Sequence, residues 1–181
     1  METLNTPQQL VSPLKTSLKY GLITGAVLIV FSLVTYYAGM MANESLQWIS
    51  YLMLAAGIFL GVKYHRDRDL GGYMSYGRGL GAGVLIGLFS AILLAVFIYL
   101  FYGMIDPGAL GELKRLQEEK MYEQGQTDEQ IEMASKFMTP EVMAIFTLPA
   151  MTFFGFIFSL IISAILKRNR PAFIEEREET V

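Results

Sequence analysis

Residues 80–102 read LGAGVLIGLFSAILLAVFIYLFY, a run of 23 residues with no Asp, Glu, Lys, Arg or His side chain. An α-helix rises about 1.5 Å per residue, so about 20 apolar residues cross a hydrocarbon core of about 30 Å. A helix on the surface of a soluble domain would carry polar side chains along one face. The run therefore predicts a transmembrane helix, and the rest of the chain is interpreted outward from it.

Three further runs without ionisable side chains lie at residues 20–41, 46–62 and 142–166. The run at 46–62 is short for a span. We expect it to extend into Lys63 and Tyr64 at one end, where long side chains reach the lipid headgroups, and to Ser45 at the other. Hydrophobic residues make up 53% of the sequence and charged residues 17%, which excludes collagen-like and disordered chains. The predicted fold class is all-α: an integral membrane four-helix bundle.

The basic residues predict how the spans are oriented. The N-terminal segment 1–19, the link between the second and third spans and the tail 167–181 together hold ten of the fourteen Lys and Arg residues. The loop 103–141 instead carries nine acidic residues against four basic ones. Under the positive-inside rule, both termini lie in the cytoplasm and the loop lies on the opposite side of the membrane. The four-span membrane domain then comprises residues 20–166.

The loop 103–141 is predicted to form an extracytoplasmic helical hairpin between spans three and four. A weakly amphipathic helix follows the turn after the third span and ends near Gly125. Thr127 and Gln130 have the spacing of a capping box, which predicts the start of a second short helix. Thr139 and Pro140 are typical of an N-cap followed by the first residue of a helix, so the fourth span is expected to begin there.

Small residues spaced four apart occur in every predicted span. Close backbone packing of such residues holds helices together in lipid, where the hydrophobic effect is absent. We favour packing within this bundle; the alternative is a dimerisation surface. The ridge residues are Gly21, Gly25, Gly57, Gly61, Gly79, Gly83, Gly87, Gly155, Ser159 and Ser163. Pro149 lies inside the fourth span, where it is expected to kink the helix and to free a carbonyl that Thr147 or Thr152 helps to satisfy.

Residues capable of catalysis are few in this sequence. There is no cysteine, and the single histidine, His65, is expected to be a polar residue at the membrane interface. None of the four uncharged runs contains an ionisable side chain, which argues against a proton-driven pump. We therefore predict no catalytic residue, no metal site and no cofactor. The acidic side chains of the loop are interpreted as a solvated face.

Three arginines, Arg66, Arg68 and Arg78, lie in the link between the second and third spans. A basic side chain near an anionic membrane surface contributes about 1 kcal/mol to lipid binding. These arginines are candidate contacts for an anionic lipid headgroup, although the positive-inside rule explains them equally well.

Several segments together resemble a bacterial membrane family, domain of unknown function 4199. The resemblance rests on KYGLITG at residues 19–25, the glycine-containing exit of the second span at 57–63, GYMSYG at 72–77 before the third span, and a polar link before a final span. It covers the chain from about Lys15 to Arg168. It implies a small protein of the bacterial inner membrane, with no established activity or catalytic residues to carry over.

The sequence supports three functional hypotheses. The first is a non-enzymatic accessory or assembly subunit that contacts a membrane protein partner or a second copy through its helices. The second is a carrier or channel for a lipid or polyprenyl-linked solute. It would use a polar face formed by Thr24, Ser32, Thr35, Thr152, Ser159 and Ser163. The third is an enzyme acting on a lipid phosphate through the link between spans two and three. Nothing in the sequence indicates nucleic-acid binding.

Overall fold

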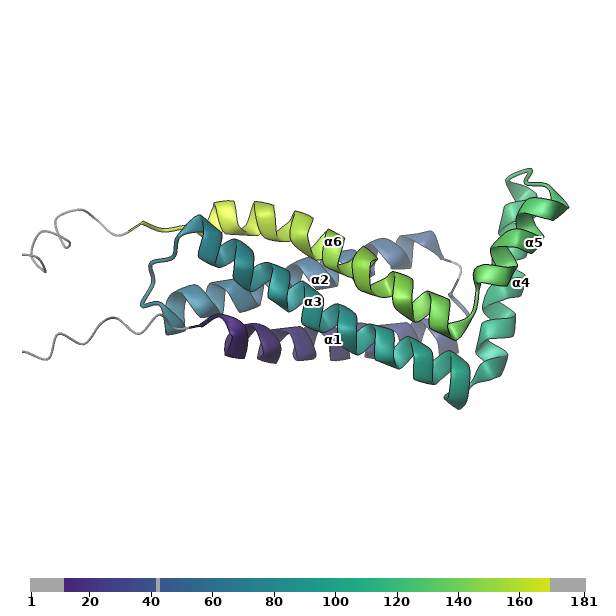
Figure 1. The fold of residues 1–181 in the computed structure, drawn as a ribbon, viewed down its shortest axis with the longest axis horizontal. Coiled ribbons are helices and arrows are strands. Elements are labelled where there is room, and N and C mark those ends of the chain that lie inside the picture. The colour runs from purple at the N-terminus through teal and green to yellow at the C-terminus, as the bar shows by residue number, and fades with distance from the viewer. Residues whose placement is uncertain (1–11, 42, 170–181) are drawn as a thin grey trace, which may run out of the picture.

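The chain forms an elongated bundle of four long helices, with a short helical hairpin set across one end (Figure 1). These features are seen in a computed structural model that describes residues 12–41 and 43–169. We call the end that carries the hairpin the hairpin end, and the end where the first helix starts and the last one stops the terminal end. The long helices are α1 (Leu14–Tyr37), α2 (Glu44–Tyr64), α3 (Tyr76–Leu100) and α6 (Pro140–Leu166). The hairpin consists of α4 (Pro107–Glu123) and α5 (Asp128–Phe137).

The first helix is displaced toward the N-terminus relative to the predicted span 20–41. It includes Lys15 and Lys19, since lysine is a good helix former and its side chain can extend to the headgroups. It stops at Tyr37 because Gly39 takes a left-handed conformation, with φ of 68°. Most of segment 1–19 and of tail 167–181 lies outside the described residues, so those two predictions stay predictions.

Two helices continue past their predicted ends as single π-helical turns. The first, η1 (His65–Asp69), follows α2, and the amide of Leu70 donates to the carbonyl of His65 at 3.1 Å. The second, η2 (Phe101–Ile105), follows α3. The second span therefore runs well beyond the predicted 46–62 and includes charged residues whose composition is typical of a loop. Single π-helical turns are rare and frequently occur at functional sites.

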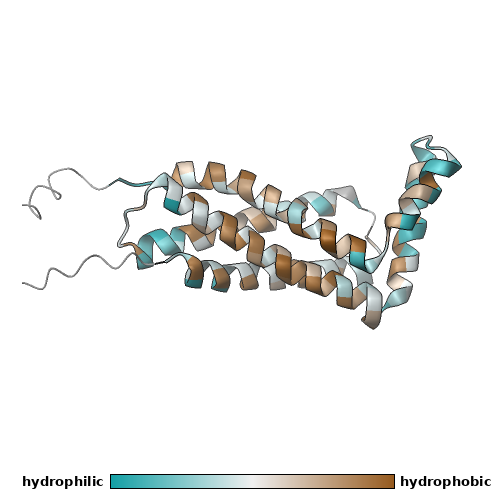
Figure 2. Cartoon of the chain, in the orientation of Figure 1, coloured by the Kyte–Doolittle hydropathy of each residue, from teal (hydrophilic) through white to brown (hydrophobic). Residues whose placement is uncertain are grey.

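The core of the bundle lies where α2 and α3 face each other between α1 and α6. Leu54, Ile58 and Ile86 are fully buried at this point. The outward faces of the long helices are apolar as well, and Val30 and Leu52 are more than half exposed. Figure 2 shows hydrophobic residues around the long helices and hydrophilic ones on the hairpin and at the terminal end. Four helices of the described chain are long and apolar enough to cross a membrane, so this is a multi-pass membrane protein.

The hairpin helices begin where the capping residues predict. Thr127 and Gln130 form both hydrogen bonds of the capping box, and Pro140 is the first residue of α6 after the N-cap Thr139. The two hairpin helices are joined by a hydrogen bond of 2.5 Å from the Ser135 hydroxyl to the Glu118 carboxylate. The all-α fold with a hairpin between the third and fourth spans is thus confirmed.

The expectation for Pro149 was only partly correct. The proline lies within α6, which continues through it. The Thr147 hydroxyl donates to the carbonyl of Met143 at 2.8 Å, whereas the carbonyl that loses its donor is that of Ile145. The Thr152 hydroxyl has no hydrogen-bond partner within the described residues. Neither threonine therefore compensates for the proline, because neither hydroxyl donates to the carbonyl of Ile145.

Candidate functional site

The ridges of α3 and α6 lie against each other inside the bundle. A Cβ atom added to Gly87 would lie 3.1 Å from the Cα atom of Gly155. Gly83 faces Ser159 in the same way, and a Cβ on Gly79 would lie 3.0 Å from the Ser163 hydroxyl. Such distances leave almost no room for a side chain, so these small residues allow the two backbones to approach.

The glycines of α1 and α2 also face neighbouring spans. Gly21 and Gly25 lie against Phe89 and Leu93 of α3. Gly57 faces Thr24 of α1, and Gly61 faces both Tyr20 of α1 and Ile86 of α3. The structure thus places every predicted ridge within the bundle, and a second copy could reach these glycines only by separating helices that are already packed together.

The polar face proposed for a carrier is not continuous. Thr24 lies against Gly57 at the α1–α2 contact, while Ser159 lies against α3 and donates to the Gly155 carbonyl at 2.6 Å. Ser163 is fully buried at the contact of α6 with α3. Thr24 therefore faces α2, whereas Ser159 and Ser163 face α3, so these hydroxyl groups do not point into a common space. These hydroxyl groups therefore do not form the single polar face that was expected for a carrier.

A buried histidine is the main feature that sequence analysis missed. His65 is 1% exposed, and its Nδ1 lies 2.8 Å from Oδ2 of Asp69, four residues later in η1. The Thr16 hydroxyl of α1 donates to the same carboxylate oxygen at 2.5 Å. The sequence predicted only a polar interface residue here; His65 is buried because η1 extends α2 and keeps it on the same face as Ile58 and Val62. His65 follows Ile58 by seven residues and Val62 by three, and this helical spacing was the signal in the sequence.

The Thr16–His65–Asp69 cluster connects α1 to η1 through one carboxylate oxygen of Asp69. A carboxylate that accepts the Nδ1 proton fixes the tautomer of a neutral imidazole and leaves Nε2 as an acceptor. Nε2 of His65 is buried and has no hydrogen-bond partner within the described residues. The cluster belongs to the helix that continues from the second span, and it lies beyond the run 46–62, which itself holds no ionisable side chain.

The three candidate headgroup arginines differ in their surroundings. Arg66 is largely covered; it donates to Asp67 at 2.6 Å and to the carbonyl of Leu166 at 3.4 Å. Arg68 and Arg78 are exposed on η1 and α3. Arg66 therefore connects the second span to the end of α6, which leaves the two exposed arginines better placed to meet a lipid headgroup.

The terminal end is further closed by a short backbone pairing. Met74 and Arg168 form an antiparallel bridge with two hydrogen bonds of 2.9 Å. The guanidinium of Arg168 lies 5.6 Å from the centre of the Tyr73 ring, a cation–π distance. The segment before α3 is thereby joined to the residues after α6, although the two are far apart in the sequence.

The hairpin is attached to the bundle through Asp106, the residue that precedes α4. The Tyr36 hydroxyl donates to Asp106 Oδ2 at 2.6 Å, while Asp106 Oδ1 accepts from the Ala109 amide at 3.1 Å. The hydrogen bond from Tyr36, followed by that from Ala109, holds the pKa of the Asp106 carboxyl below its usual value. Asp106 thus caps α4 and links it to the end of α1.

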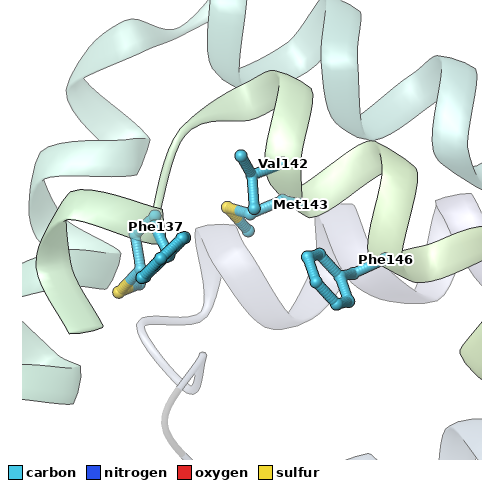
Figure 3. Close-up of a pocket in the computed structure, with 5 residues that line it drawn as sticks. Phe137, Val142, Met143 and Phe146 are labelled. Carbon is cyan, nitrogen blue, oxygen red and sulfur yellow. The ribbon is translucent and has the colours of Figure 1, made fainter. Parts of the chain in front are cut away.

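An apolar pocket of about 400 Å³, open to one side, lies at the turn from α5 into α6, and we call it the hairpin corner. Figure 3 shows Phe137 of α5 and three side chains from the start of α6 around it. Phe137 and Phe146 are 62% and 67% exposed, so the pocket is open and its two aromatic rings are accessible. The hairpin corner is lined by Phe137, Met138, Val142, Met143 and Phe146.

Metal-binding groups are not assembled within the described part of the chain. No three or more His, Asp or Glu side chains there are close enough to hold a metal ion. The exposed acids of α4 partly pair with neighbouring bases, as Glu112 does with Arg115 at 2.7 Å. The predicted absence of a cofactor and of a catalytic residue stays a prediction.

The fold and these sites define a multi-pass membrane protein with a hairpin across one end of a four-helix bundle. Residues 19–168 match the model of a family described as "Protein of unknown function (DUF4199)", and the chain belongs to this family. The resemblance predicted from the sequence motifs is thereby confirmed. No curated protein and no solved structure matches the chain.

Proposed function

We propose that this protein is a non-enzymatic accessory or assembly subunit that binds a partner membrane protein at the hairpin corner. The observation that supports the proposal is the apolar pocket at the turn from α5 into α6. An aliphatic or aromatic side chain at the end of a partner's transmembrane helix fits such a pocket in size and polarity. The ridges of small residues are used within the bundle, so lateral contacts need a different surface.

The hairpin corner has two properties of a protein contact. Its two phenylalanine side chains are exposed at the turn between the hairpin and a span, and aromatic residues including Phe are enriched in the cores of protein interfaces. The stripe of apolar residues also extends along α5 to Met133, which is more than half exposed outside the four spans. A partner could thus contact a span and the hairpin together.

Affinity purification of the tagged full-length protein from its native membrane in a mild detergent tests this proposal. The partner is identified by mass spectrometry and its recovery is then compared between Phe146→Ala and Phe153→Ala. Both phenylalanines lie on the same face of α6 and are similarly exposed, but only Phe146 lines the pocket. Loss of a central aromatic contact costs about 2 kcal/mol, so Phe146→Ala should weaken binding roughly 30-fold. Equal recovery from both variants, or no stoichiometric partner, would contradict the proposal.

The proposed location is the bacterial cytoplasmic membrane, with the terminal end in the cytoplasm and the hairpin outside it. The distribution of basic residues supports this orientation. Because the chain has no cysteine, single variants Arg68→Cys and Gln124→Cys can be labelled without background. A membrane-impermeant maleimide added to intact spheroplasts should modify Cys at 124 and leave Cys at 68 unmodified. The reverse pattern would invert the proposed orientation.

A carrier is a second candidate, and the buried Thr16–His65–Asp69 cluster favours it. Ionisable residues within membrane spans are typical of proton relays in transporters. Proteoliposomes with an entrapped pH-sensitive dye test this function, using a pH gradient and Asp69→Asn as the matched variant. A carrier that uses this cluster should move protons only in the wild type. Equal dye responses from the wild type, Asp69→Asn and empty vesicles would exclude the candidate.

A further inference from the structure

A second pocket, of about 210 Å³, lies at the hairpin end between α1, α2 and α4. We call it the α1–α2 pocket. No element that lines it contributes to the hairpin corner, so a ligand bound in it would be independent of the proposed function. Its polar lining consists of hydroxyl and amide side chains together with one lysine, namely Ser32, Thr35, Asn43, Gln47, Ser50, Gln117 and Lys120.

Several of these polar groups have unused hydrogen-bonding capacity. The side chains of Ser32, Gln47 and Gln117 make no hydrogen bond within the described residues. Thr35 donates to the carbonyl of Ser32 at 2.9 Å but keeps its acceptor lone pairs. The Asn43 side-chain oxygen accepts from the Ser45 amide at 3.0 Å, which leaves its NH₂ group as a donor. The pocket therefore offers both donors and acceptors to a ligand.

The depth of the pocket matches the headgroup region of a bilayer. Ser32 precedes the last residue of α1 by five positions, and Ser50 follows the first residue of α2 by six. At about 1.5 Å per residue, the pocket extends roughly 8 to 9 Å inward from the helix ends. Apolar Phe31 and Leu46 line it beside the polar groups. A molecule that joins a polar headgroup to apolar chains fits this combination.

We propose that the α1–α2 pocket binds the polyol phosphodiester headgroup of a phospholipid in the leaflet at the hairpin end. Hydroxyl groups both donate and accept, so a glycerol headgroup complements amides and hydroxyls that do the same. A choline headgroup has no donor, and a phosphate monoester offers mainly acceptors. The ligand class is therefore phosphatidylglycerol or a lipid with an equivalent polyol headgroup.

Native mass spectrometry of the detergent-purified full-length protein tests this assignment. The protein is delipidated and then mixed with equal amounts of phosphatidylglycerol, phosphatidic acid and phosphatidylcholine that carry the same acyl chains. Two additional hydrogen bonds to the polyol should enrich phosphatidylglycerol over each of the other lipids about fivefold or more. Equal retention of phosphatidylglycerol and phosphatidic acid would show that charge alone is recognised, which overturns the proposal.

Variants of pocket residues test whether the lipid binds in the α1–α2 pocket. The double variant Ser32→Ala, Gln47→Leu should reduce the preference to near unity, while Gln124→Leu, an exposed change on the hairpin outside the pocket, should leave it intact. Gln117→Leu lies on α4 outside the spans and provides an independent test if the double variant does not fold. If the folded double variant keeps the preference for phosphatidylglycerol, the proposal is overturned. If the double variant does not fold, a preference that persists in Gln117→Leu overturns it instead.

Soluble glycerophosphoglycerol distinguishes a lipid from a free headgroup as the natural ligand. At a concentration equal to that of the lipid it should not displace phosphatidylglycerol, because it lacks the chains that contact Phe31 and Leu46. Displacement at equal concentration would overturn the assignment to a lipid.

Discussion

The two ends of the bundle are held together in different ways. At the terminal end, Thr16 and His65 share the carboxylate of Asp69, and Met74 pairs with Arg168 through the backbone. At the hairpin end, the hydrogen bond from Tyr36 to Asp106 connects α1 to the hairpin, and two open pockets lie beside the hairpin helices. The comparison indicates a closed end that fixes the arrangement of the spans and an open end that is available for binding.

The middle of the bundle should be less tolerant of substitution than either end. Gly83→Ile introduces a side chain where α3 already touches Ser159 and Ile58, and overpacking of this kind should cost about 3 kcal/mol of unfolding free energy. Thermal unfolding in a mild detergent, followed by circular dichroism, measures the effect. Gly81→Ile is the matched control, because nothing lies within 4 Å of Gly81. Equal loss of stability in both variants would contradict the packing described for α3 and α6.

At the terminal end, Asp69→Ala should be the most damaging polar substitution. It leaves the buried Nδ1 atom of His65 and the Thr16 hydroxyl without their hydrogen-bond partner, which should cost about 2 kcal/mol of unfolding free energy. The control is Asp67→Ala, whose exposed ion pair with Arg66 should contribute less than about 1 kcal/mol. The same unfolding assay compares them. If both variants are equally stable, the cluster does not hold the terminal end closed.

At the hairpin end, Tyr36→Phe removes one hydrogen bond and should weaken the attachment of the hairpin by about 1 kcal/mol. The bundle itself should unfold as before, since the hydroxyl does not contact its core. Amide hydrogen exchange in the first turn of α4 should accelerate by roughly fivefold. Tyr37→Phe is the control, because that side chain is 78% exposed. Unchanged exchange in Tyr36→Phe would show that the hairpin is held by other contacts.

The smallest predicted effect is the pH dependence of the attachment of the hairpin. Because the pKa of Asp106 is lowered in the folded state, its contribution to hairpin attachment is fully present above its unfolded pKa and is lost as pH falls through the folded value. Exchange in α4 should therefore be insensitive to Asp106 between about pH 8 and 5 and should increase below about pH 4, after correction for intrinsic exchange. Asp106→Asn should remove this acid-dependent step. A step that persists in the variant would assign it to another carboxylate.

Sequence reasoning was most successful where one local property determines the structure. Long uncharged runs predict spans because the bilayer requires them, and Thr127 predicts a helix start because capping depends on three neighbouring residues. The end of the second span was missed because charged residues after Lys63 are typical of a loop, whereas here they continue the helix as η1. The spacing of Ile58, Val62 and His65 on one face carried that information.

The two pockets could not be predicted from sequence patterns. Phe137 and Phe146 come together because a short turn at Thr139 redirects the chain from the hairpin into α6, and the angle of that turn is set by tertiary packing. The α1–α2 pocket likewise needs α4 to lie across the end of α1, an arrangement to which the hydrogen bond from Tyr36 to Asp106 contributes. The small residues of the ridges were recognisable, but their partners across the bundle were not.

The pairing of Met74 with Arg168 has a mechanical consequence. Its two backbone hydrogen bonds join the segment before α3 to the residues just after α6. A pulling force applied to the C-terminal segment therefore meets this bridge before it reaches the last turn of α6. As long as the bridge holds, the load is divided between α3 and α6, which are antiparallel and packed along their length. Both helices therefore resist a force applied to the C-terminal segment.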